Sequence, residues 1–127
     1  MNVMSRRRVF IVEDEALIAM ELEDRLQQFG FEVCGRAARG DQALAQIPEA
    51  APDVVVMDVN LGGGLSGFEV ADQLAAVCDV PVVFLTAYSE AEFSERAGGR
   101  APLYVLKPFQ PGALRAALER ALGARPA

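Results

Sequence analysis

Short apolar runs alternate with longer amphipathic segments along the whole chain. The amphipathic segments carry helical spacing or helix start and stop signals. The apolar runs predict strands at residues 8–12, 31–37, 52–59, 81–86 and 103–107. The segments between and after them predict helices at residues 15–30, 40–50, 67–78, 89–99 and 110–123. Five such units predict an α/β protein with a doubly wound parallel sheet and helices on both of its faces.

Local signals support two of the helices. Leu17, Met20, Leu22 and Leu26 recur near helical spacing, and Gly30 marks the end of that segment. Ser89 is a cap signal at the start of the segment 89–99. Because no linker, repeat or low-complexity stretch divides the 127 residues, we expect a single domain with a core at about 7–123.

Composition and charge exclude several classes of protein. Apolar residues make up 52% of the chain, but no apolar run is long enough to cross a bilayer and no leader is evident, so we expect a soluble cytoplasmic protein with no membrane partner. The net charge of −6 argues against nucleic-acid binding, and the basic run Arg6–Arg8 is too short to change that. Histidine is absent, which excludes histidine-based catalysis, zinc binding through histidine and a phosphohistidine carrier. Cys34 and Cys78 are expected to be reduced, buried and small hydrophobic residues.

Polar residues that could take part in chemistry or bind a metal stand at the ends of four of the predicted strands. Taken singly, each has a structural explanation as a cap, a turn former or a solvated end. The carboxyl ends of parallel strands meet at one edge of a sheet, so together they predict one site. The residues are Glu13, Asp14, Glu15, Asp58, Thr86 and Lys107.

The charges of this predicted site require a cation. Carboxylates about 5 Å apart repel by about 3 kcal/mol per pair at an effective dielectric constant near 20. Lys107 is the only lysine among 12 basic residues, and it cannot by itself neutralise Glu13, Asp14 and Asp58. Mg²⁺ suits a few carboxylate and carbonyl oxygens. With a hydroxyl and an ammonium beside a carboxylate, the set predicts phosphoryl transfer to that carboxylate.

Four motifs at the strand ends resemble a known family as a set. They are "VEDE" at 12–15, "MDVN" at 57–60, "LTA" at 85–87 and "YVLKPF" at 104–109. Over nearly its whole length the chain resembles the receiver domain of two-component response regulators. The resemblance implies a flavodoxin-like receiver fold with five helices and strand order 2-1-3-4-5, in a single receiver domain spanning residues 1–127.

The resemblance implies a role for each acidic residue. Asp58 would be the phosphoacceptor, and Glu13, Asp14, Asp58 and the backbone carbonyl of Asn60 would hold Mg²⁺. The family often carries aspartate where this chain has Glu13, whose extra methylene favours a metal contact through water.

Further residues would sense the phosphoryl group. Thr86 would contact it through the hydroxyl, and Lys107 would pair with Asp58 before phosphorylation and with the phosphoryl group afterwards. Tyr104 occupies the position of a switch aromatic residue that turns inward when Thr86 moves. The Lys107–Pro108 peptide bond would be cis.

Two features point to a subgroup of the family. The glycine-rich loop at 62–64 lacks the proline usual in receivers and is one residue longer, and with "VEDEALIAMELED" it resembles receivers that accompany HWE-type histidine kinases.

Asn60 and Tyr88 occupy positions that modulate dephosphorylation. Tyr88 would gate the attacking water, which predicts slow autodephosphorylation.

The implied function is a phosphorelay rather than enzymatic turnover of a separate substrate. A histidine kinase or a histidine phosphotransfer protein would donate the phosphoryl group, and the face built from residues 89–99, 103–107 and 110–123 would change its affinity for a protein partner. We expect a monomer or weak homodimer without an attached output domain, read by a partner that binds from outside.

Three alternatives remain at this point. An aspartyl-phosphate phosphatase would need a second acid two residues after Asp58, where this chain has Asn60. A flavin-binding module would need a phosphate-cradling loop after the first strand, where "EDEA" is acidic. In a docking protein without chemistry, the acidic residues would serve as helix caps.

Overall fold

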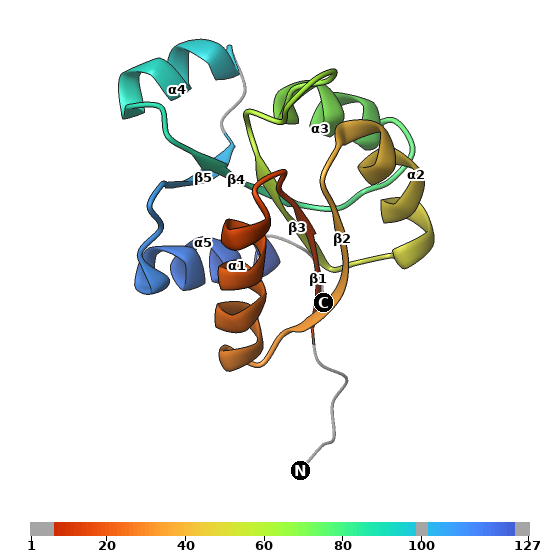
Figure 1. Cartoon of the computed structure of the whole chain (residues 1–127), viewed down its shortest axis with the longest axis vertical. Coiled ribbons are helices and arrows are strands. Elements are labelled where there is room, and N and C mark those ends of the chain that lie inside the picture. The colour runs from red at the N-terminus through yellow and green to blue at the C-terminus, as the bar shows by residue number, and fades with distance from the viewer. Residues whose placement is uncertain (1–6, 99–101, 124–127) are drawn as a thin grey trace.

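Five parallel strands form one sheet in the order β2-β1-β3-β4-β5 (Figure 1). This confirms the fold class and the strand order expected from the sequence. The strands are β1 (Arg8–Val12), β2 (Glu32–Ala37), β3 (Val54–Asp58), β4 (Val82–Thr86) and β5 (Leu103–Leu106).

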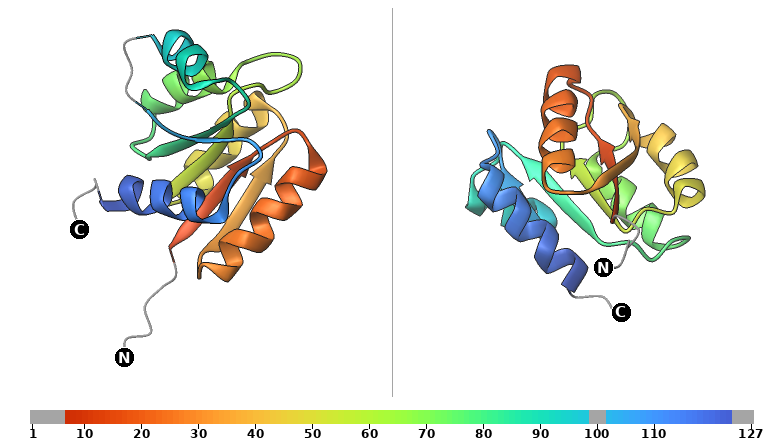
Figure 2. Two further views of the ribbon diagram at one scale, coloured as in Figure 1. Left: turned by 90° about the vertical axis from the view of Figure 1, so that its left-hand side faces the viewer. Right: turned by 90° about the horizontal axis from the view of Figure 1, so that it is seen from below.

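Helices cover both faces of the sheet (Figure 2). Helices α1 and α5 pack on one face, and α2, α3 and α4 pack on the other. Helix α3 ends three residues earlier than expected, and the other bounds differ by at most two residues from the prediction. The helices are α1 (Ala16–Gln28), α2 (Gly40–Ala50), α3 (Gly67–Ala75), α4 (Glu90–Ala97) and α5 (Pro111–Gly123).

This computed structural model describes residues 7–98 and 102–123. Arg6 of the basic run and Gly99, the expected end of the fourth helix, lie outside the described residues. Within them, none of the helices combines the length and apolar character that a membrane crossing requires.

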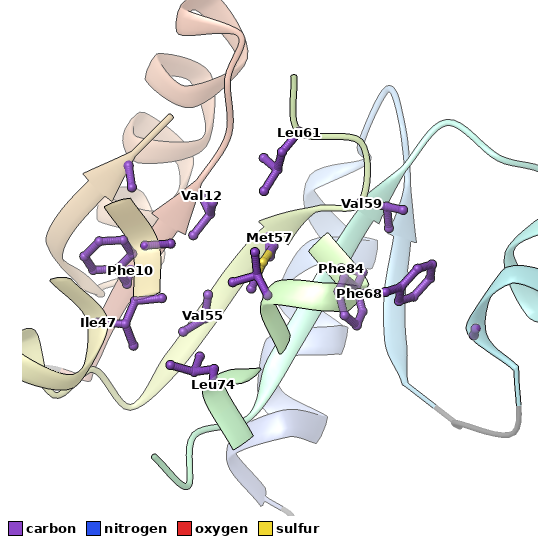
Figure 3. Packing of buried hydrophobic residues seen from close by; sticks show 14 of the residues in the cluster. Phe10, Val12, Ile47, Val55, Met57, Val59, Leu61, Phe68, Leu74 and Phe84 are labelled. Atoms are coloured by element: carbon purple, nitrogen blue, oxygen red, sulfur yellow. The ribbon is translucent and has the colours of Figure 1, made fainter. Parts of the chain in front are cut away.

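The central strand β3 is buried on both faces of the sheet. Its side chains alternate between the two helix layers, so Met57 points into the layer that contains Phe68 and Leu74 of α3 (Figure 3). Val56 points into the opposite layer. Burying each such side chain contributes about 1.5–3 kcal/mol, so β3 and the residue that ends it, Asp58, are held rigidly.

The apolar residues of α1 divide between two sides of the helix. Leu22 and Leu26 are fully buried, whereas Leu17 is 80% exposed and Met20 is 56% exposed. At about 100° per residue, Leu17 and Leu22 lie about 140° apart around the helix axis, so the four residues cannot share one buried face.

Helix α4 is attached to the sheet mainly through one aromatic side chain. Among its residues only Phe93 and Ala97 are buried. The Phe93 ring stacks on Tyr104 of β5 with a centroid distance of 4.2 Å, and it also contacts Phe68 and Phe84. The position of α4 is therefore coupled to that of Tyr104.

Two helices begin with the same reciprocal cap. Ser89 Oγ accepts a hydrogen bond from the Glu92 amide, and the Glu92 carboxylate accepts one from the Ser89 amide. This confirms the cap expected at Ser89. Ser66 and Glu69 form the same arrangement before α3, and the spacing Ser-x-x-Glu was the signal that would have revealed it.

Both cysteines are free and half-buried. The expected full burial is wrong, because Cys34 lies on the edge strand β2 and Cys78 lies beyond the end of α3, where only one side of each residue is covered.

Candidate functional site

The strands deliver the polar residues to one edge of the sheet, as their parallel arrangement requires. Asp58 is the last residue of β3 and Thr86 is the last residue of β4, while Glu13 and Lys107 directly follow β1 and β5. The backbone ties these ends together, because the Lys107 amide donates a hydrogen bond to the Thr86 carbonyl at 2.7 Å. The Glu13 amide donates to the carbonyl of Ala37 in β2 at 3.0 Å.

The single lysine lies between carboxylates. Lys107 Nζ is 3.0 Å from Asp58 Oδ2 and 3.1 Å from Glu13 Oε1. A third carboxylate, that of Glu15, approaches to 3.9 Å from the solvent side. Side-chain exposure is 15% for Lys107 and 5% for Asp58, so the first of these ion pairs is largely shielded from water.

Three carboxylates form a cluster suited to a divalent cation. One oxygen each from Glu13, Asp14 and Asp58 can lie within 4.8 Å of the others. Glu13 and Asp58 are buried and Asp14 is exposed, so the cluster opens to solvent on one side. A pocket of about 230 Å³ lies beside Glu13 and Asp14.

One buried oxygen in the cluster lacks a hydrogen bond. Oε1 of Glu13 accepts none from the described residues, although the Lys107 ammonium lies near it. A buried carboxylate oxygen in this condition, next to two further hard oxygen ligands, fits Mg²⁺ or a water molecule bound to it.

Burial and charge shift the pKa values of Glu13 and Lys107. The pKa of the Glu13 carboxyl is raised to about 7, mainly by burial; the Asp58 charge acts in the same direction, and the Glu15 amide and Lys107 oppose the increase. For Lys107, burial lowers the pKa of the ammonium, but the hydrogen bond with Asp58 and the negative charges of Asp58 and Glu13 outweigh burial and leave it above its ordinary value. Lys107 therefore stays charged while one of its partners is reluctant to ionise.

Backbone amides of the loop after β3 orient the carboxylates. The Asn60 amide donates to Asp58 Oδ1 at 3.1 Å, and the Gly62 amide donates to Asp14 Oδ2 at 3.2 Å. The Asp58 side chain thus has one oxygen on the Asn60 amide and the other on Lys107. Sequence reasoning missed the Gly62 contact, because it depends on the path of the loop.

Gly67 fixes the far end of that loop. Its amide donates to the carbonyl of Val59 at 2.7 Å. A Cβ atom at Gly67 would lie 2.9 Å from the Val59 Cα and would collide with the carbonyl oxygen of Asp58. Only glycine allows α3 to start this close to the backbone of the central carboxylate.

Tyr88 links the loops that follow β3 and β4. Its amide donates to the hydroxyl oxygen of the buried Thr86 at 3.0 Å, and its own hydroxyl donates to Asn60 Oδ1 at 3.0 Å. The Arg96 guanidinium of α4 lies 4.6 Å from the centroid of the Tyr88 ring. Nothing in the sequence near Arg96 indicates this contact, which depends on how α4 packs.

Tyr104 lies apart from the carboxylate cluster, on the side of α4. Burial raises the pKa of its phenol, and the charge of Glu90 and a hydrogen bond with it add to the effect. The ring is half-buried against Phe93. The Lys107–Pro108 peptide bond is cis.

Comparison with known proteins identifies the family. The family model of the response regulator receiver domain matches residues 9–119. The chain is 39% identical over 117 residues to the transcriptional regulatory protein PdtaR of Mycobacterium tuberculosis, covering 91% of this chain and 57% of that protein. It is 35% identical over 115 residues to the phyllosphere-induced regulator PhyR of Methylorubrum extorquens, covering 90% of this chain and 43% of that protein. The chain thus spans about half the length of these curated relatives.

A solved structure shows the same fold. The solution structure of the receiver domain of PhyR from Erythrobacter litoralis superposes with a TM-score of 0.84 at 34% identity, covering 99% of this chain and 97% of the other. Family match, fold and strand order agree, and the chain belongs to the response regulator receiver domain family, the signalling domains of two-component systems.

Proposed function

We propose that Asp58 accepts a phosphoryl group from the phosphohistidine of a histidine kinase or a histidine phosphotransfer protein, with Mg²⁺, and that this changes a protein-binding face. The observation that carries the proposal is the setting of Asp58. It is a buried carboxylate that contacts the only lysine at 3.0 Å and shares a cluster within 4.8 Å with Glu13 and Asp14.

The carboxylates of Glu13, Asp14 and Asp58, with the Asn60 carbonyl, would hold the cation, with Glu13 acting through water. Bound Mg²⁺ would supply neutralisation of the charge on the phosphoryl oxygens. The chain itself holds the Asp58 carboxylate in one orientation through Lys107 and the Asn60 amide. An oxygen of Asp58 forms the new bond to phosphorus while the bond from phosphorus to the donor nitrogen breaks, and Lys107 then pairs with the phosphoryl group.

The contacts of Thr86 and Tyr104 support a switch. The Thr86 hydroxyl oxygen already accepts a hydrogen bond from the Tyr88 amide, so the hydroxyl proton of Thr86 can be donated to a phosphoryl oxygen. Movement of Thr86 toward that oxygen would pull on the loop that leads into α4. Tyr104 stacks on Phe93 of α4, so both residues would transmit the change to the same helix.

The proposed partner-binding face consists of α4, β5 and α5. A pocket of about 400 Å³ between β5 and α5 is lined by Leu103, Tyr104, Ala117 and Arg120 among other residues, and it gives this face a recess for a protein side chain.

We also propose that the chain is one cytoplasmic receiver domain, monomeric or weakly dimeric, that works with an HWE-type histidine kinase. The glycine-rich loop at 62–64 supports the kinase assignment.

The decisive experiment is phosphorylation with a small-molecule donor. Incubation with acetyl phosphate and Mg²⁺ should give one labile phosphoryl adduct by intact-mass measurement, and Asp58→Asn should give none. Asp79→Asn, at an exposed acid outside the site, is the matched control and should behave as the parent. A parent chain that forms no adduct, or an adduct that persists in Asp58→Asn, would contradict the proposal and favour a docking protein.

Metal binding is tested separately by thermal unfolding. Millimolar Mg²⁺ should raise the melting temperature, because a ligand that binds only the folded chain stabilises it. Asp14→Asn should abolish most of this increase, and Asp79→Asn should retain it.

A further inference from the structure

Tyr88 is held at three points that belong to different parts of the fold. Its backbone is tied to Thr86 at the end of β4, its hydroxyl to Asn60 two residues beyond Asp58, and its ring to Arg96 of α4. The bond to Asn60 spans the two loops directly beyond Asp58 and Thr86. The Tyr88 side chain therefore bridges the edge of the site at which Asp58 lies.

Neither of the first two contacts fixes the ring by itself. The backbone contact leaves the side chain free to rotate. The hydroxyl contact is solvent-exposed, so water competes for both the Tyr88 hydroxyl and the Asn60 oxygen. The Arg96 guanidinium contacts the ring instead, and a cation in this position favours one ring orientation.

We infer that Arg96 is a positioning residue for Tyr88 and that it lengthens the lifetime of the phosphoryl group on Asp58. This inference rests on the proposed function, since it concerns the loss of the same phosphoryl group. Arg96 acts through the Tyr88 ring, whose hydroxyl is hydrogen-bonded to Asn60 in the loop that follows Asp58.

Loss of the phosphoryl group is a hydrolysis. The oxygen of a water molecule forms a bond to phosphorus, and the bond between phosphorus and the Asp58 carboxylate oxygen breaks with its electron pair returning to the carboxylate. The water protons leave with inorganic phosphate and solvent. The Tyr88 side chain, hydrogen-bonded to Asn60, limits the access of that water to phosphorus. When Arg96 is lost, the ring leaves this position more often, and hydrolysis becomes faster.

The inference also links phosphate lifetime to α4. Because Arg96 lies on the helix whose burial depends on Phe93 and Ala97, a displacement of α4 carries Arg96 away from Tyr88. A protein that binds α4 and holds Arg96 over the ring should therefore extend the lifetime, and one that displaces the helix should shorten it.

The test measures the rate of phosphoryl loss after removal of acetyl phosphate at constant Mg²⁺. A cation–π contact at an exposed site corresponds to a change of about two- to fivefold in population. Arg96→Ala should therefore accelerate the loss about two- to fivefold, and Arg96→Lys, which keeps a cation, should stay near the parent. The loss from Tyr88→Ala should be at least as fast as from Arg96→Ala.

Two comparisons separate positioning from a general structural effect. Arg96→Ala should cause no further acceleration in the Tyr88→Ala background, because the ring that it positions is already absent. Arg115→Ala is the matched control, because the Arg115 guanidinium lies 5.5 Å from the centroid of the Phe29 ring, in another part of the fold. The rate of phosphoryl loss in Arg115→Ala should equal that of the parent.

A spectroscopic measurement tests the contact without any phosphorylation. The Arg96 Nε–H resonance, shifted upfield by the Tyr88 ring, should return downfield in Tyr88→Ala.

The outcomes distinguish the two proposals. An unchanged rate in Arg96→Ala, or an equal acceleration with and without the Tyr88 ring, overturns the inference and leaves the proposed function intact. A parent chain that forms no adduct overturns the proposed function and this inference with it.

Discussion

Replacing Glu13 by glutamine should stabilise the chain above neutral pH in the absence of divalent cations. Glu13 is 3% exposed, and burial raises the pKa of its carboxyl from 4.5 to about 7. The ionised form is therefore disfavoured in the folded chain relative to the unfolded one. Glutamine keeps the shape of the side chain and removes the charge.

The magnitude follows from the pH range over which folding takes up a proton. At about 1.4 kcal/mol for each pH unit between 4.5 and about 7, the ionised Glu13 costs about 3 kcal/mol of folding free energy. Its contribution to stability is fully present below pH 4.5 and is lost as the pH rises through about 7. Glu13→Gln does not have this loss, so its free energy of unfolding should rise relative to that of the parent as the pH increases.

The assay is urea denaturation of both proteins with a metal chelator between about pH 5 and about pH 8. The difference in the free energy of unfolding, variant minus parent, should grow with pH and approach about 3 kcal/mol at the upper end. Glu49→Gln, at an exposed position on α2, is the matched control for loss of one negative charge and should show no comparable growth.

A difference that stays flat or shrinks with increasing pH would refute the reasoning, because it would mean that the folded chain does not resist ionisation of Glu13. Added Mg²⁺ gives a second check. It should stabilise the parent more at about pH 8 than at about pH 6, roughly one pH unit to either side of the Glu13 pKa, and it should stabilise Glu13→Gln less than the parent at the higher pH.

Four further substitutions test the packing and capping by urea denaturation. Phe93→Ala should lower the free energy of unfolding by about 3–5 kcal/mol, because it removes a ring that is 2% exposed; a loss below about 1 kcal/mol would mean that α4 is held by something else. Gly67→Ala should lower it by about 1–3 kcal/mol through contact with the backbone of Asp58, whereas Gly112→Ala, with nothing within 4 Å of the added Cβ, should raise it by up to about 1 kcal/mol. Ser66→Ala should cost about 1 kcal/mol by removing the cap of α3, and an unchanged value would show that Glu69 caps the helix alone.

The pattern of apolar runs and amphipathic segments was sufficient to predict the fold class, and the strand order followed from the family resemblance. The bounds of β1 and α2 agree with those expected from the apolar pattern, because a strand buried on both faces leaves a continuous apolar run and a short amphipathic helix leaves a period of about 3.6 residues. In α1 the pattern was insufficient. Apolar residues lie on both sides of that helix, and only the packing against the sheet shows that Leu22 is buried while Leu17 is exposed.

The sequence could predict some of the contacts in the candidate site but not others. The ends of parallel strands must meet, so the proximity of Asp58, Thr86 and Lys107 could be predicted from the sequence. Contacts between loops could not. The hydrogen bond between Tyr88 and Asn60 joins residues 28 apart in the sequence through exposed loop conformations that local residue preferences do not determine.

The glycine-rich loop after β3 is anchored at both ends and has open space around Gly63 and Gly64. Gly62 is tied to Asp14 at one end and Gly67 to Val59 at the other. Between them, Gly63 has no atom within 4 Å of the position that a Cβ would occupy. Doubling the length of a flexible loop costs only about 0.6 kcal/mol. A peptide tag or an environment-sensitive dye inserted after Gly63 would therefore sit within a few residues of Asp58 without moving it, which makes this loop a place to build a reporter of phosphorylation into the chain.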